Sequence, residues 1–107
     1  MTTARETNKA LKALLCDFLE EYRHIDSLDS FASVCFIYKD RADDIICDEE
    51  LRLKRLPEGE ERERRLDSLS DLDRSLKRLL TTQAACDGTI SRAHIEALGR
   101  DIDSAIS

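Results

Sequence analysis

Between residues 58 and 86, leucines alternate with charged residues at the spacing of an amphipathic helix. On a wheel with about 100° per residue, six leucines fall within about 140°, and Arg, Asp, Ser and Lys occupy the other side. These leucines are Leu66, Leu69, Leu72, Leu76, Leu79 and Leu80. The pattern predicts a long helix over residues 58–86 that packs against another helix and has no reactive group on its apolar face.

Two further amphipathic segments precede this one. Over residues 4–24, apolar side chains recur at three- and four-residue steps from Leu11 to Tyr22. Over residues 28–56 they recur from Phe31 onward, but the stretch 31–38 is apolar around most of its circumference. A helix of that kind is either central in its bundle or shared with a second chain.

Turn signals separate these segments. Asp26, Ser27 and Asp29 are all good N-caps for a second helix that begins near residue 28, and Pro57 prevents the chain from continuing smoothly into the third. Gly88 suits a left-handed cap after the third helix, and Ser91 can cap a fourth over residues 91–106. The 37% of charged residues, the single Pro and the three Gly are also typical of long helices joined by short turns.

The expected fold is therefore all-α, and residues 1–107 form one helical domain. It is a four-helix, bundle-like arrangement built on a long antiparallel hairpin of the second and third helices. The helices are expected at residues 4–24, 28–56, 58–86 and 91–106.

Charge narrows the classes of partner. The chain carries a net charge of −6, which argues against nucleic acid because phosphate binding needs a basic surface. Residues 26–51 hold eight acidic against two basic side chains, whereas residues 52–80 hold nine basic against seven acidic. The acidic group at residues 43–50 is interpreted as a solvated face or as a docking face for a basic partner.

The four cysteines and the absence of long apolar runs indicate the cellular compartment in which the protein is expected. Cys16, Cys35, Cys47 and Cys86 lack the close pairs typical of zinc sites and disulfide frameworks. The first residues are polar, and no run approaches the ~18 apolar residues of a membrane span. We therefore expect a cytoplasmic or otherwise intracellular protein with no membrane partner. We expect Cys35, Cys47 and Cys86 in the core and Cys16 exposed.

One short segment suggests a different class of protein. Asp87-Gly88-Thr89-Ile90-Ser91 resembles the middle of an EF-hand calcium loop, between a Leu-rich helix and an Ile/Leu helix. The full pattern would span residues 83–94, but Gln83 and Ala85 stand at the first two ligand positions, and His94 stands in place of the final bidentate Glu. The alternatives are a degenerate EF-hand-like regulator that does not bind calcium, and a glycine cap followed by a helix start.

Other chemistry-bearing patterns are incomplete. Glu21 and His24 have the Glu-x-x-His spacing of di-iron bundles, but that site requires a second such element and two more glutamates. His94 and Glu96 have the H-x-E spacing of zinc deaminases, without the accompanying Pro-Cys-x-x-Cys. We therefore expect no enzymatic activity, no catalytic or metal-binding residues and no cofactor.

The function expected is a non-enzymatic, helical protein–protein interaction module, such as an assembly factor, adaptor or regulatory subunit. It is expected to form a homo-oligomer, most simply a dimer, or to bind another helical or basic protein. Asp73 stands out because it falls within the leucine stripe, either in a packing seam where it fixes register or on the rim beside a Lys or Arg. The expected interaction residues are Phe31, Phe36, Ile37, Tyr38, Leu66, Leu69, Leu72, Asp73, Leu76 and Leu80.

Overall fold

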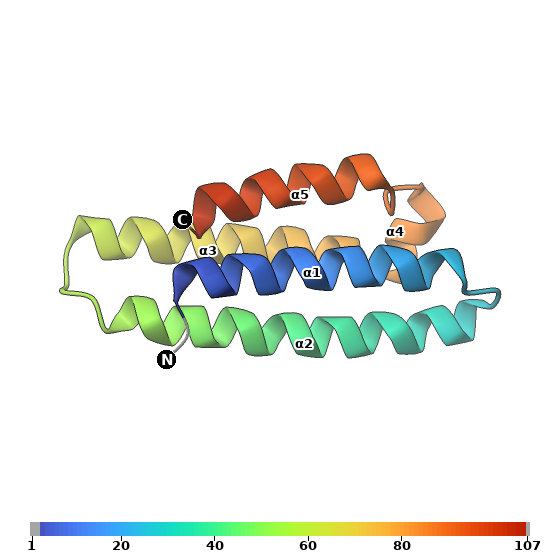
Figure 1. Cartoon of the computed structure of the whole chain (residues 1–107), viewed down its shortest axis with the longest axis horizontal. Helices are drawn as coiled ribbons and strands as arrows, with labels where there is room; N and C mark the ends of the chain where they lie inside the picture. Colours follow the sequence, from blue (N-terminus) through green and yellow to red (C-terminus); the bar gives the residue numbers. More distant parts are fainter. Residues whose placement is uncertain (1–2, 107) are drawn as a thin grey trace.

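A computed structural model describes residues 3–106, which form helices joined by short turns, without strands. Four long helices and one short helix follow one another along the chain (Figure 1). Their bounds are α1 Ala4–Arg23, α2 Leu28–Lys54, α3 Glu60–Leu79, α4 Thr82–Asp87 and α5 Arg92–Ala105. The expected all-α class is confirmed.

Side-chain caps define where several helices start. The hydroxyl oxygens of Thr3, Ser27 and Ser91 accept hydrogen bonds from the backbone N–H groups three residues ahead, at the starts of α1, α2 and α5. Such caps satisfy backbone donors that have no partner within the helix. Ser91 caps α5 as the sequence predicts, and Ser27 is the one of the three candidates that caps α2.

The prediction of one continuous helix over residues 58–86 is wrong. Leu80 leaves the helical conformation at ψ 53°, and Thr81 is extended. The Thr81 hydroxyl donates to the Arg78 carbonyl at 2.9 Å and accepts from the Ala84 N–H at 3.0 Å. Threonine hydroxyls compete in this way with the helical backbone, so Thr81 both ends α3 and starts α4.

The four long helices form an up-and-down bundle. Successive long helices run antiparallel, and α1, α2, α3 and α5 form a closed ring of packed neighbours (Figure 1). The α2–α3 hairpin extends beyond the ends of α1 and α5, which contributes to the longest dimension of 48 Å against 23 and 19 Å. The hairpin predicted from Pro57 is therefore present, with its charged tip projecting from the bundle.

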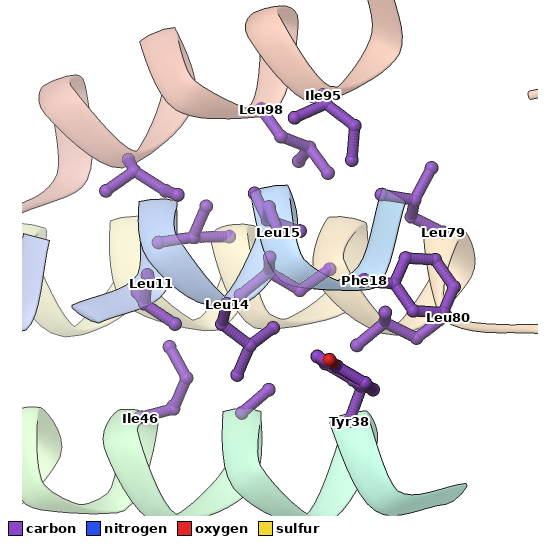
Figure 2. Close-up of a cluster of buried hydrophobic side chains, with 14 of the residues drawn as sticks. Leu11, Leu14, Leu15, Phe18, Tyr38, Ile46, Leu79, Leu80, Ile95 and Leu98 are labelled. Atoms are coloured by element: carbon purple, nitrogen blue, oxygen red, sulfur yellow. The ribbon is translucent and has the colours of Figure 1, made fainter. Parts of the chain in front are cut away.

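The core lies along the axis of this ring (Figure 2). Leu11, Leu15 and Phe18 of α1 are at most 1% exposed, and they face buried residues from all the other long helices. An amphipathic helix buries its apolar stripe in this way because removal of apolar surface from water is favourable. All four long helices therefore contribute to one core.

Candidate protein-interaction surface

The leucines that were expected from the sequence to form an interaction surface lie in the interior of the helical bundle. Each is at most 3% exposed except Leu66, which is partly buried against the same core. The buried members are Leu69, Leu72, Leu76 and Leu80. Their packing partners are the other helices of this chain, so their stripe is covered within the bundle.

Phe31 and Tyr38 are also buried, each at 3% exposure. They belong to an aromatic cluster between α1 and α2, in which the Phe18 ring centroid lies 6.0 Å from that of Phe31 and 5.4 Å from that of Tyr38. Tyr22 meets Phe31 edge-on at 5.2 Å. Burial raises the pKa of the Tyr38 hydroxyl. Their place is therefore in the core and not on an outer surface.

Phe36 and Ile37 are different, because they are 74% and 47% exposed. Leu51, at 57%, and the exposed Cys47 lie along the same side of α2, within about 100° on the helical wheel. We call Phe36, Ile37, Cys47 and Leu51 the α2 outer strip. Sequence reasoning missed the last two as site residues, although their position off the main apolar stripe of α2 was the signal.

Acidic residues interrupt the α2 outer strip. Asp40 and Asp44 lie between its two apolar ends, and Asp48 lies beside Leu51. All three carboxylates are exposed, and none forms an ion pair with another residue in the described range 3–106. The outward side of α2 is therefore apolar at both ends and negatively charged between them.

Two basic residues of α2 and one acidic residue contact other groups of the chain. The Arg41 guanidinium lies 5.1 Å from the Tyr38 ring centroid, and Lys54 pairs with Glu50 at 2.9 Å. Asp43 forms an ion pair with Lys77 of α3, which raises the pKa of that lysine. The acidic group at residues 43–50 is thus divided, and only part of it faces solvent without a partner.

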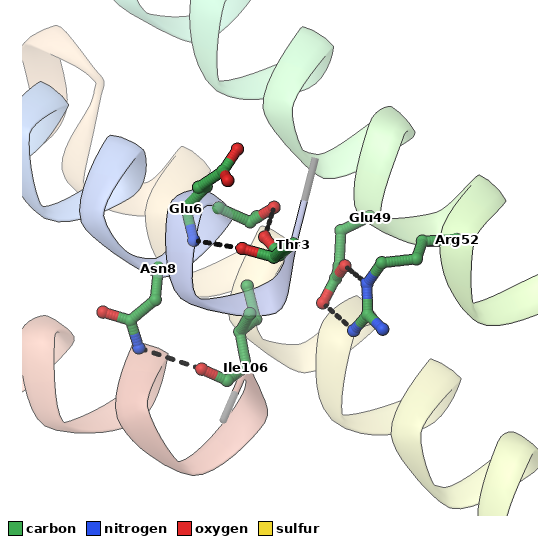
Figure 3. Close-up of polar contacts among 7 residues, drawn as sticks. Thr3, Glu6, Asn8, Glu49, Arg52 and Ile106 are labelled. Carbon is green, nitrogen blue, oxygen red and sulfur yellow. Dashed lines mark hydrogen bonds and ion pairs between the residues drawn. The ribbon is translucent and has the colours of Figure 1, made fainter. Parts of the chain in front are cut away.

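Glu49 is the member of that group that the sequence placed wrongly. It was interpreted as part of an acidic face, but it is 1% exposed. Arg52 donates two hydrogen bonds to its carboxylate, from Nε at 2.5 Å and from Nη2 at 2.8 Å (Figure 3). Glu49 follows Ala42 by seven residues and precedes Leu53 by four, which puts it on the buried side of α2. The pair belongs to the core rather than to an external site.

Asp73 lies at the rim of the α2–α3 contact, with its side chain 31% exposed. Lys77 Nζ lies 3.3 Å from one carboxylate oxygen and 3.4 Å from the other, and only the second contact has hydrogen-bond geometry. The same lysine reaches Asp43 of α2. Of the two interpretations drawn from the sequence, the rim position beside a lysine describes this arrangement.

The cysteines are mostly at the surface. Cys35 is buried, and burial raises the pKa of its thiol. Cys16 is exposed as expected, but Cys47 and Cys86 are exposed as well, so their assignment to the core is wrong. Both lie on helices whose opposite sides supply the buried residues, and a free thiol is small enough to occupy either side.

Residues 83–94 form the end of α4, a cap and the start of α5. Gly88 has φ 72°, and the Thr89 N–H donates to the Ala84 carbonyl at 3.0 Å, which is the closing bond of a Schellman motif. The Asp87 carboxylate accepts from Gln83 Nε2 at 2.9 Å. This local geometry is the glycine cap and helix start that the sequence offered as one alternative.

Two open hollows of about 300 and 290 Å³ lie side by side between α3 and α5. Their linings share Ser75 and Asp101, and the second includes His94. The His94 ring lies 2.8 Å from the hydroxyl of Ser91, which caps its own helix. Within residues 3–106, no three His, Cys, Asp or Glu side chains gather in a way that could hold a metal ion.

No helix in the described part of the chain combines the length and the apolar character that crossing a membrane requires. Comparison with known protein families, with curated proteins and with solved structures finds no match.

Proposed function

We propose that this protein is a non-enzymatic interaction module that binds another protein through the α2 outer strip. The observation that carries the proposal is the exposure of three large apolar side chains along one side of the longest helix. Phe36, Ile37 and Leu51 are 74%, 47% and 57% exposed. Large apolar side chains that a folded domain leaves exposed along one side are typical of protein interaction sites.

The rest of the bundle supports this assignment. The other apolar stripes are covered within the chain, so the strip is not a gap left by an incomplete core. Phe36 and Ile37 are the two residues of the expected interaction set that remain largely open to a partner. Aromatic side chains, Phe among them, are enriched at protein interfaces.

A photo-crosslinking amino acid at position 36 tests the proposal in the cells from which the sequence derives. The expected result is a discrete adduct, with a second copy or with another protein, that disappears when Leu51→Ser is added. The control carries the same crosslinker at Leu28, which is 62% exposed at the start of α2, outside the strip. The absence of an adduct at position 36, or equal adducts at positions 28 and 36, would contradict the proposal.

A further inference from the structure

The charges beside the α2 outer strip identify the kind of partner that fits it. We propose that the strip binds an amphipathic helix of a different protein, with Lys or Arg residues between two apolar clusters. This inference rests on the proposed function and specifies its partner.

The spacing sets the length of the partner. Phe36 and Leu51 are fifteen residues apart on one continuous helix, which corresponds to about 22 Å at 1.5 Å per residue. A helix of about 16–18 residues lying along α2 would reach both apolar ends. Its middle turns would then lie over Asp40 and Asp44.

The carboxylates set its charge. Asp40, Asp44 and Asp48 follow one another at four-residue steps, an arrangement of like charges that destabilises a helix. None of them has an ion-pair partner among residues 3–106, and the nearby bases Arg41 and Arg52 lie against Tyr38 and Glu49. Binding a helix with Lys or Arg at the facing positions would compensate these charges.

A second copy of the chain would do the opposite. In an antiparallel pair of α2 helices that brings Ile37 against Leu51, Asp44 faces Asp44 and Asp40 faces Asp48. A parallel pair places each aspartate against its own equivalent. Like charges that face one another across an interface weaken binding, so both arrangements disfavour a second copy as the partner. The charge pattern thus favours a basic helix over the homodimer expected from sequence.

Two labelled 18-residue helical peptides test this inference with the full chain. Both carry Leu at the two ends of one side, and they differ only in having three Lys or three Glu between these ends. Fluorescence anisotropy should show at least tenfold tighter binding of the Lys peptide at 50 mM salt. The preference should weaken at 500 mM salt, where exposed charges are screened.

Variants separate the apolar and the charged contributions. Phe36→Ser/Leu51→Ser should abolish binding, whereas Leu28→Ser should not. Asp40→Asn/Asp44→Asn should remove the preference for the Lys peptide. The control Asp67→Asn/Asp71→Asn makes the same change of net charge on α3 and should leave that preference intact. All four changes alter exposed residues, and circular dichroism verifies that the helices are retained.

Several results would overturn the inference. Equal binding of both peptides at the strip would show that the aspartates do not select the partner. A wild-type dimer that Phe36→Ser dissociates would show that a second copy occupies the strip. Either result would overturn this inference and leave the proposed function standing. No binding of either peptide would overturn the basic-helix partner, while crosslinking at position 36 would still decide the proposed function independently.

Discussion

At the scale of single residues, the burial of Glu49 depends on one partner. Its carboxylate is withdrawn from water on the core side of α2, and Arg52 supplies two hydrogen bonds to it. The bond to Glu49 also raises the pKa of the guanidinium. A buried charge without its partner is strongly unfavourable, so the two residues act as a unit.

Replacing Arg52 by Met should therefore destabilise the fold more than replacing both residues. We expect Arg52→Met to lower the free energy of unfolding by about 2–3 kcal/mol, below the ~3–5 kcal/mol of a fully buried pair, because the Arg52 side chain is 27% exposed to water. Glu49→Met/Arg52→Met should recover most of this loss. Urea unfolding of both variants measures the difference, and equal losses would show that the pair is not coupled.

The ionisation of Asp103 makes the stability of the fold depend on pH in a direction that the structure predicts. Lys12, at 2.6 Å, and Asn8, at 3.0 Å, donate hydrogen bonds to its carboxylate and hold its pKa below the ordinary value of 3.8. A carboxyl with a lowered pKa stabilises the fold above its unfolded pKa and loses that contribution as the pH falls through its folded pKa. The contact between α1 and α5 is therefore weakened in acid.

The comparison with Asp103→Asn isolates this contribution. The wild type should be more stable than the variant near neutral pH, by an amount that stays constant down to about pH 4.5 and shrinks towards pH 2. Urea denaturation at a series of pH values measures the difference between the two proteins. A difference that persists unchanged at pH 2 would contradict the assignment to Asp103 ionisation.

At the scale of elements, two glycines have opposite roles. Gly88 ends α4 in the left-handed conformation, at φ 72°, whereas Gly99 lies inside α5. A Cβ atom added at either position would meet no other atom within 4 Å. The backbone conformation alone therefore distinguishes the two sites.

Alanine at these positions should change stability in opposite directions. We expect Gly88→Ala to lower the free energy of unfolding by about 1–2 kcal/mol, because the left-handed conformation is unfavourable for a residue with a Cβ. Gly99→Ala should raise it by about 0.5–1 kcal/mol, because glycine is a poor helix former. Thermal and urea unfolding of the two single variants test this, and a loss at position 99 would contradict it.

At the scale of the whole molecule, the bundle closes its core without a second chain. Phe18 is 0% exposed and contacts the aromatic residues of α2, while Phe36 points to solvent from the same layer of the bundle. The cytoplasmic location and the oligomeric state expected from sequence stay predictions. Self-association would have to use surface that the folded chain already exposes.

Two phenylalanine variants distinguish a self-contained bundle from half of a shared one. Phe18→Ala should lower the free energy of unfolding by about 3–5 kcal/mol through lost packing and a cavity. Phe36→Ala should change it by less than about 0.5 kcal/mol, independently of protein concentration. Urea unfolding at two protein concentrations makes the measurement. A concentration-dependent loss for Phe36→Ala would show that Phe36 is buried between copies.

The sequence by itself determined the helical class, most helix bounds and many of the residues that face the core. Periodicity identifies Leu69, Leu76 and their neighbours as buried, because helix geometry fixes which residues share a side. Gly88 and Ser91 identify helix ends for equally local reasons, since caps depend on residues within one turn. The break at Thr81 was missed because Leu80 continues the spacing of the preceding leucines, and that spacing concealed a local capping signal.

Only the tertiary structure decided which apolar residues stay uncovered. Phe31 and Phe36 both belong to the apolar stretch 31–38, which could have been covered on every side, but one packs against Phe18 of α1 and the other is 74% exposed. The same holds for charge, since Asp43 meets Lys77 across two helices while Asp44 next to it faces solvent. Periodicity assigns each residue to a side of its own helix, but burial and pairing depend on what lies opposite that side, which is set by contacts between segments distant in the chain.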